Sequence, residues 1–89
     1  MRVEFFGIPR LRAGVSTIDI KLDGEAESLR GVLQIVAAAC PEFADSCLVD
    51  GWLKTGYVIN IDGEEFVSDP DVLISNLNTL IVMSSDAGG

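Results

Sequence analysis

The residues of this chain best suited to chemistry are the last six, residues 84–89, with the sequence SSDAGG. Gly88 and Gly89 lack a Cβ, so the main chain here can adopt backbone angles closed to other residues and can thread a narrow channel. A side chain at position 89 would crowd attack on the carbonyl carbon. A terminal Gly-Gly is therefore either a frayed end or a reactive main-chain terminus, and in the second case the reactive group would be the carboxylate of Gly89. The preceding residues would form a tether that threads into a partner: Ser84, Ser85, Asp86, Ala87 and Gly88.

A tether of this length would, when extended, hold the reacting carbon roughly 15–20 Å from the folded body. The carbon could then reach deep into the active site of another protein. The alternative is an inert end, because terminal residues are usually disordered and tolerate change. The elements that precede the tail bear on this choice.

The residue types give less support to catalysis, metal binding or cofactor binding by this chain. The chain contains no histidine, which excludes a Ser-His or Cys-His catalytic pair and predicts that there is no zinc site. Cys40 and Cys47 fit neither a Cys-x-x-Cys redox pair nor a zinc spacing, so we expect two small, partly buried hydrophobic side chains. No glycine-rich phosphate loop is present, so we expect no bound ATP or other cofactor. The acidic residues at predicted turns are expected to be solvated surface rather than acid/base catalysts: Asp62, Glu64, Glu65, Asp69 and Asp71.

The charge balance limits the kind of partner. Fourteen acidic residues against six basic ones give a formal net charge of −8. This sign argues against nucleic acid and against anionic membrane surfaces, which both require lysine and arginine. It favours a partner with a basic docking surface, although acidity that merely keeps a small protein soluble explains the charge equally well. No apolar run is long enough to span a membrane, and the start MRVEFF is unlike a signal peptide, so we expect a cytoplasmic protein.

The 89 residues predict one domain with a single core. Alternation of apolar residues predicts a strand at 2–7, with Val3 and Phe5 on one face, which Pro9 and Gly14 then interrupt. A second alternating strand is predicted at 16–24, as the other arm of a hairpin.

The hydrophobic period then changes to that of a helix. Its apolar stripe consists of Leu29, Val32, Leu33, Val36 and Cys40. Ser28 is the predicted N-cap, and Pro41 is expected to end the helix at about Cys40. Residues 42–56 are predicted to be a surface loop with a short helical turn near Phe43 and with Trp52 as its aromatic anchor.

The last third of the chain returns to the strand pattern. Residues 57–67 predict a hairpin about Asp62-Gly63, and residues 79–84 predict the final strand. Between them, Ile74 and Leu77 are expected to pack under the sheet. This order of elements predicts an α+β fold in which a mixed sheet wraps around one helix and the first and last strands pair in parallel at the centre. That pairing would bury four residues against the helix: Val3, Phe5, Leu80 and Val82.

Four stretches of the chain together resemble a known family. They are VEFFG with PRLRAG, SLRGVL, VINIDG, and TLIVMSSDAGG at the end. The chain is similar to the ubiquitin-like sulfur carriers of the β-grasp fold, such as the small subunit of molybdopterin synthase and the thiamine-pathway carrier. It departs from the molybdopterin-type pattern at residues 76–78 and at residues 84–85. The resemblance implies a β-grasp domain at 1–83, with a sheet of four to five strands on one main helix, and a flexible Gly-Gly tail at 84–89.

The resemblance also implies a function for the tail. A ubiquitin-activating-type adenylating enzyme would use ATP to adenylate Gly89, and the acyl-adenylate would become a thiocarboxylate that donates sulfur in biosynthesis. The chain itself would be a carrier rather than an enzyme, and a larger synthase subunit is a further candidate partner. Two alternatives stay open: a protein modifier joined through Gly89 to lysines, and a non-catalytic β-grasp interaction domain.

A partner also needs a folded surface to bind, because a flexible tail loses entropy when it becomes ordered. If Leu80 and Val82 face the helix, the neighbouring residues of the last strand must point the other way. The sequence therefore predicts an apolar docking patch at the base of the tail, made of Phe6, Val58, Asn60, Ile81 and Met83.

Overall fold

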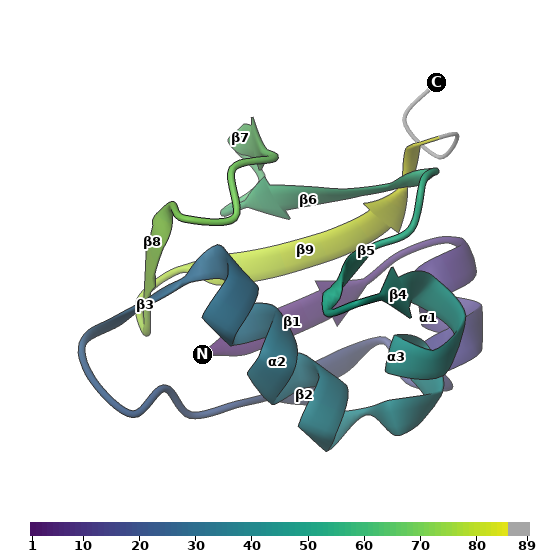
Figure 1. Cartoon of the computed structure of the whole chain (residues 1–89), viewed down its shortest axis with the longest axis horizontal. Helices are drawn as coiled ribbons and strands as arrows, with labels where there is room; N and C mark the ends of the chain where they lie inside the picture. The colour runs from purple at the N-terminus through teal and green to yellow at the C-terminus, as the bar shows by residue number, and fades with distance from the viewer. Residues whose placement is uncertain (86–89) are drawn as a thin grey trace.

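A computed structural model of the protein describes residues 1–85. Its main sheet has five strands in the order β2-β1-β9-β6-β7 (Figure 1). Their bounds are β1 Arg2–Phe5, β2 Thr17–Asp19, β6 Tyr57–Ile61, β7 Glu65–Val67 and β9 Thr79–Ser84. Strands β1 and β9 run parallel, whereas the other neighbouring pairs are antiparallel. The predicted central parallel pair and the predicted α+β fold class are thus confirmed.

The hydrophobic alternation of β1 and β9 explains why this pair occupies the centre of the sheet. Val3 lies opposite Leu80 and Phe5 opposite Val82, and all four side chains are buried. Because successive side chains of a strand point to opposite faces, this register gives both strands one apolar face. That face is covered by helix α2, Leu29–Ala39 (Figure 1).

Helix α2 begins and ends where the sequence predicts. The Ser28 Oγ accepts a hydrogen bond of 3.1 Å from the Gly31 N–H, which satisfies one of the free donors of the first turn. Cys40 is the C-cap, directly before Pro41. The predicted stripe is buried throughout, so this helix provides one side of the core.

Replacing the cap tests this local argument. Ser28→Ala is expected to lower the free energy of unfolding by about 1 kcal/mol, because the Gly31 N–H loses its acceptor. Urea unfolding followed by circular dichroism measures the change. Ser68→Ala, at an exposed position, is the matched control and should change stability by less than about 0.5 kcal/mol. An equal effect of both substitutions would contradict the capping role.

Two further helices lie where the sequence predicted a strand break and a short helical turn. These are α1, Ile8–Ala13, and α3, Pro41–Cys47, which pack against each other. Proline is acceptable in the first helical turn, and both helices carry one there. Gly14 then ends α1 in the left-handed region at φ 77°. The predicted break after the first strand and the predicted helical turn near Phe43 are confirmed, whereas the helix at 8–13 was not predicted.

The predicted loop at 42–56 is also largely ordered. After α3 comes a hairpin of β4, Leu48–Val49, and β5, Trp52–Leu53. Its two turn residues, Asp50 and Gly51, both have positive φ, as the tight turn of a two-residue hairpin requires. Figure 1 shows this hairpin beside α3.

A second small sheet joins β3, Ala26–Ser28, to β8, Leu73–Ser75, and the sequence did not predict it. Ile74 is buried, as predicted. Leu77 was predicted to pack under the sheet, but its side chain is 94% exposed. The turn after β8 points it into solvent, so that prediction was wrong.

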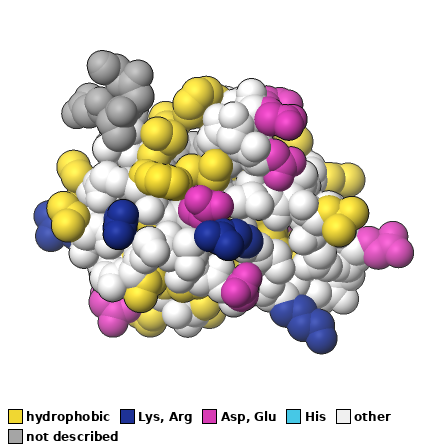
Figure 2. Space-filling view, turned by 180° about the vertical axis from the view of Figure 1, so that it is seen from behind, with side chains coloured by type: hydrophobic (Ala, Val, Ile, Leu, Met, Phe, Trp, Pro, Cys, Tyr) yellow, Lys and Arg dark blue, Asp and Glu magenta, His cyan; other side chains and the backbone are white. Residues whose placement is uncertain are grey.

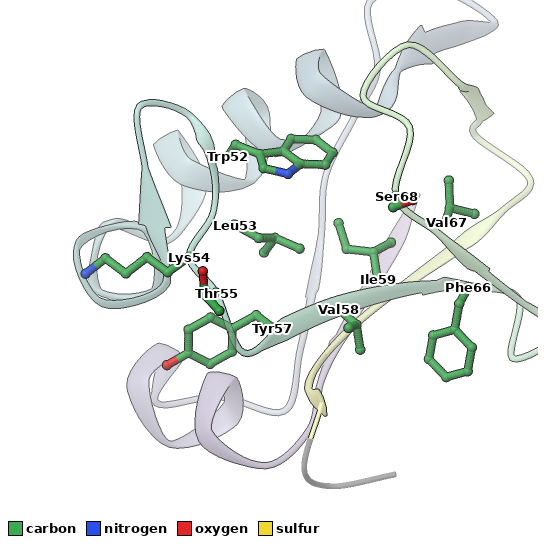
Figure 3. Close-up of a pocket in the computed structure, with 10 residues that line it drawn as sticks. All are labelled: Trp52, Leu53, Lys54, Thr55, Tyr57, Val58, Ile59, Phe66, Val67 and Ser68. Atoms are coloured by element: carbon green, nitrogen blue, oxygen red, sulfur yellow. The ribbon is translucent and has the colours of Figure 1, made fainter. Parts of the chain in front are cut away.

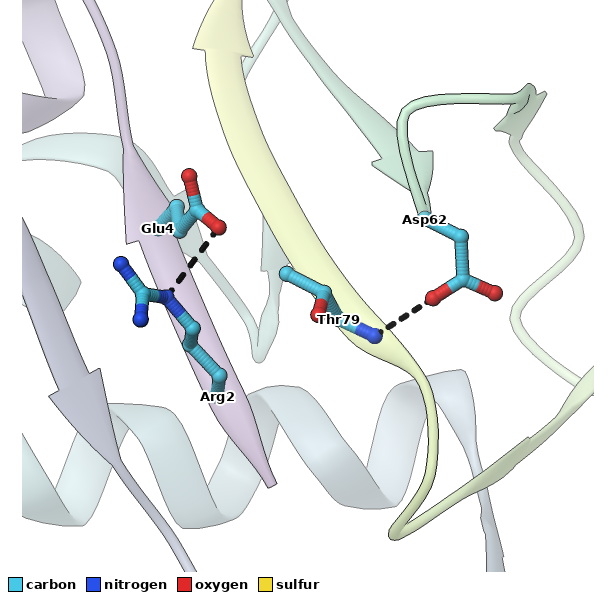
Figure 4. Close-up of polar contacts among 4 residues, drawn as sticks. All are labelled: Arg2, Glu4, Asp62 and Thr79. Atoms are coloured by element: carbon cyan, nitrogen blue, oxygen red, sulfur yellow. Dashed lines mark hydrogen bonds and ion pairs between the residues drawn. The ribbon is translucent and has the colours of Figure 1, made fainter.

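The Asp62-Gly63 turn forms as predicted, with φ 61° at Asp62 and 73° at Gly63. The carboxylate of Asp62 then joins this hairpin to the beginning of β9. Its Oδ1 accepts a hydrogen bond of 2.7 Å from the Thr79 N–H (Figure 4). Its Oδ2 accepts one of 2.8 Å from the Asn78 side-chain amide. Asp62 therefore fixes the position at which β9 starts.

Candidate functional site

The face of the main sheet that points away from α2 carries the predicted docking patch. In register, Glu4, Ile81, Asn60 and Phe66 lie opposite one another across β1, β9, β6 and β7. Val58 lies opposite Met83 in the next row of the same face. Figure 2 shows hydrophobic side chains gathered on this back face of the molecule, beside acidic and basic side chains near its centre.

Phe6 completes the patch at the end of β1. Its N–H donates a hydrogen bond of 2.9 Å to the Val82 carbonyl, which continues the pairing of β1 with β9 beyond Phe5. Because Phe5 points into the core, strand alternation turns Phe6 to the opposite face, where it is largely exposed. The structure thus brings all five predicted patch residues to one face of the sheet. Their role in binding stays a prediction.

Phe66 belongs to this surface and was missing from the predicted patch. Its side chain is 65% exposed, and it lies directly opposite Asn60 on β7. The signal was present in the sequence, because the register set by the Asp-Gly turn places Phe66 on the same face as Asn60. We refer below to the set Phe6, Val58, Asn60, Phe66, Ile81 and Met83 as the docking face.

The beginning of the predicted tether needs one correction. Ser84 is the last residue of β9, lies opposite Tyr57 and is buried. The Ser85 N–H donates a hydrogen bond of 2.8 Å to the Gly56 carbonyl. Pairing with β6 therefore continues past Met83, because the chain before Tyr57 still offers acceptors to β9. Ser84 is part of the strand and not of a tether, and the other predicted tether residues and Gly89 lie at or beyond the end of the described part.

One ion pair lies on the docking face. The Arg2 Nε lies 3.2 Å from a carboxylate oxygen of Glu4, on the same strand (Figure 4). Glu4 is the neighbour of Ile81 on the β1 side. The apolar part of the face therefore has the Arg2–Glu4 ion pair at one edge.

An apolar hollow lies beside β6, and Val58 and Phe66 of the docking face contribute to its lining. A cavity of about 280 Å³ lies between the β4–β5 hairpin and the β6–β7 hairpin (Figure 3). Trp52 and Leu53 form one wall, and Ile59, Val67 and Ser68 form the other. The lining is mainly apolar with one cation, Lys54, and brings together no pair of acidic groups that could exchange a proton with a substrate. Trp52 is half-buried, with the guanidinium carbon of Arg30 lying 5.8 Å from the ring centroid, so the predicted aromatic anchor is confirmed.

Within residues 1–85, no group of three or more histidine, cysteine, aspartate or glutamate side chains is placed to hold a metal ion. Among the helices of the same residues, none has the length and apolar character that a membrane span requires.

Both cysteines are free and buried, which confirms the prediction that they are small hydrophobic side chains. Burial raises the pKa of the Cys47 thiol above its ordinary value of 9.0. A thiol reacts as the thiolate, so Cys47 is a poor nucleophile in the folded protein.

The raised pKa of Cys47 predicts how stability depends on pH. The unfolded chain releases this proton near pH 9, whereas the folded chain retains it to higher pH, so the folded state loses stability as pH rises above about 9. Urea unfolding between pH 8 and pH 10.5 should show this loss. Cys47→Ala is the control, and its stability should fall less steeply over the same range. Identical slopes for both proteins would contradict the assignment to Cys47.

Comparison with known proteins supports the fold. No family model and no curated protein sequence matches the chain. Among solved structures, the small archaeal modifier protein 1 of Haloferax volcanii has a TM-score of 0.78 and 19% identity, covering 94% of each chain. A chain of the BexX/CysO complex of Amycolatopsis orientalis has a TM-score of 0.73 and 16% identity, covering 99% of this chain and 98% of that one. The Urm1 protein of Sulfolobus solfataricus has a TM-score of 0.57 and 17% identity, covering 94% and 99%.

The structural similarities and the order of the strands together identify the fold. The chain has the β-grasp fold of ubiquitin-like proteins, as the four sequence stretches predicted. At sequence identities this low, structural similarity establishes the fold alone. The residues that bear on function are those of the docking face and the tail.

Proposed function

We propose that this protein is a sulfur carrier whose carboxylate at Gly89 is activated by a partner enzyme. The observation that carries the proposal is the continuity of β9. This central strand exposes Ile81 and Met83 on the docking face and leads within a few residues to Gly88 and Gly89. A partner that binds the face would therefore receive the Gly-Gly segment at its own active site.

The chemistry explains why an activating partner is needed. A carboxylate is a poor acyl donor until one oxygen becomes part of a leaving group. In the proposed reaction, the Gly89 carboxylate attacks the α-phosphate of ATP and pyrophosphate leaves. A sulfide nucleophile then attacks the acyl carbon and AMP leaves, which produces a thiocarboxylate. ATP and the catalytic groups belong to the partner, a ubiquitin-activating-type adenylating enzyme, and this chain is its protein cosubstrate.

The receiving side of the reaction requires a second partner. A thiocarboxylate can donate its sulfur in a biosynthetic pathway of the molybdopterin type or a related one, on a larger synthase subunit that binds the same face. The formal charge of −8 favours basic docking surfaces on both partners. One chain of the BexX/CysO complex is similar in fold to this protein. Its presence in a complex supports the proposal that this protein binds its partners through the folded domain.

A protein modifier is the second candidate function. The name of the similar Haloferax volcanii structure, small archaeal modifier protein 1, favours it. In that case the same acyl-adenylate at Gly89 would be transferred to a lysine amine, and an isopeptide bond would form instead of a thiocarboxylate. Both functions use the same activation step, so the product distinguishes them.

The intact mass of the protein from its native cells, carrying a tag at the N-terminus, tests the proposal. An exchange of oxygen for sulfur localised to Gly89 is the expected result. A branched peptide that joins Gly89 to a lysine of another protein would replace the carrier by the modifier. An unchanged carboxylate, even after incubation with the adenylating enzyme and ATP, would contradict both and leave a non-catalytic interaction domain.

A further inference from the structure

Asn60 is the one polar side chain in the middle of the docking face, and it is only 7% exposed. Its neighbours across the sheet are Ile81 on β9 and Phe66 on β7. Among residues 1–85, the Asn60 Oδ1 is buried without a hydrogen-bond donor. A hydrogen-bond acceptor is thus enclosed by apolar side chains at the centre of the surface that we assign to partner binding.

Such an arrangement is unfavourable for the free protein. A buried polar atom without a partner has lost its hydrogen bonds to water and gained none in return, whereas an apolar side chain of similar size at the same position has no such cost. Neighbouring outward positions on β6 and β9 show that apolar residues fit here, since Ile81 lies opposite Asn60 and Val58 and Met83 form the next row. Asn60 destabilises the free protein at a position where an apolar residue would fit. We therefore look for its role in the complex with a partner.

Small movements bring the carboxamide within reach of a bound protein. Phe66 is 65% exposed, so its ring has room to change rotamer. A half-turn of the Asn60 carboxamide about the Cβ–Cγ bond also exchanges the positions of the oxygen and the nitrogen. Neither movement disturbs the pairing of β6 with its two neighbours.

We propose that Asn60 determines partner specificity on the docking face: its side-chain oxygen accepts a hydrogen bond from an arginine or lysine that the adenylating partner presents among apolar residues. This inference rests on the proposed function, because it assigns a role within the same docking face.

The net charge of the protein favours a basic donor over a neutral one. Glu4 lies next to Ile81 in the same row, but the Arg2 Nε lies 3.2 Å from its carboxylate, so this pair adds little net charge on the β1 side of the face. The formal net charge of −8 favours a cationic donor over longer distances. A cation that enters this apolar surface needs an acceptor there, because a buried cation without one is strongly unfavourable. Asn60 supplies that acceptor at the centre and thereby selects partners that carry the cation.

The test compares three variants in binding to the purified adenylating enzyme of the source organism, with ATP present. Asn60→Leu removes the acceptor while keeping the approximate size, and should raise Kd about 10- to 100-fold. In the free protein the same variant should raise Tm by about 4 °C, because the unpaired acceptor is gone. Asn60→Asp keeps an acceptor and adds charge, and it should bind at least as tightly as the wild type. Gln34→Leu, an exposed polar-to-leucine change on α2, is the matched control and should leave Kd unchanged.

Three results would overturn the inference. The first is a Kd for Asn60→Leu within about twofold of the wild type. The second is a loss of binding accompanied by a fall in Tm, which would make Asn60 a structural residue. The third is an Asn60→Asp variant that binds as weakly as Asn60→Leu, because a basic donor would not reject a carboxylate. Wild-type protein that supports no ATP–pyrophosphate exchange with the enzyme would instead refute the proposed function itself, and with it the inference.

Discussion

Deletion of Gly88 and Gly89 is expected to abolish ATP-dependent activation of the protein while leaving its melting temperature unchanged. The proposed acceptor of the adenylyl group is the Gly89 carboxylate, and a deleted chain would present the side chain of Ala87 where the backbone must thread freely. The last strand ends at Ser84, so the deletion removes no residue from the sheet. ATP–pyrophosphate exchange with the adenylating enzyme and thermal unfolding measure the two quantities.

The control for this deletion keeps the length of the chain. Ser85→Ala removes a hydroxyl next to the strand but retains the N–H that bonds to the Gly56 carbonyl. We expect exchange activity within about threefold of the wild type, since only a small side chain is lost. Full activity in the deleted chain would show that the Gly-Gly segment is inert and that binding is the whole function.

Phe43→Ala is expected to have the largest effect on stability, a loss of about 3–5 kcal/mol. Phe43 on α3 is fully buried, and its ring centroid lies 5.0 Å from that of Phe5 on the central strand β1. Removing the ring opens a cavity between α3 and the sheet and also removes the contact between the two rings. For a domain of this size, a loss of this magnitude is a large part of the total stability. Urea unfolding gives the change in free energy.

Phe66→Ala is the matched control for the same chemical change. Phe66 is 65% exposed on the docking face, so its removal should alter stability by less than about 0.5 kcal/mol. The same variant should weaken binding of the adenylating enzyme, because it removes an exposed apolar side chain from the face. A loss below about 1 kcal/mol for Phe43→Ala would mean that α3 does not belong to the core.

The sequence predicts the strands and the main helix of this fold because their hydrophobic periods are regular. The stripe from Leu29 to Cys40 and the alternation in β9 each have one buried face, and burial decides both period and register. The Asp62-Gly63 turn is equally local, since it depends on two residues that accept positive φ. These signals also placed five residues of the docking face correctly on one side of the sheet.

The short helices were predicted only in part. A helical turn was expected near Phe43 and corresponds to α3, whereas α1 was not expected, because Pro9 and Gly14 favour a break when only the strand pattern is considered. Both helices are at most seven residues long, too short to be stable alone. They form because Ala13 and Phe43 become buried against other elements, and a contact of that kind does not appear in a local pattern. The unpaired oxygen of Asn60 is likewise visible only when the neighbouring strands are in place.

The position of β9 between β1 and β6 has a consequence for the order of folding during synthesis. Without this strand, the β1–β2 pair and the β6–β7 pair share no hydrogen-bonded neighbour in the main sheet. Because β9 spans residues 79–84, a nascent chain still attached to the ribosome carries two separate strand pairs and an uncovered helix stripe until those residues emerge. The parallel contact of β1 with β9 closes a loop of most of the chain, and contacts so distant in sequence form late. The strand that would deliver the tail to a partner is therefore also the one that completes the fold. A chain that still lacks β9 would have neither a complete sheet nor a tail that a partner could bind.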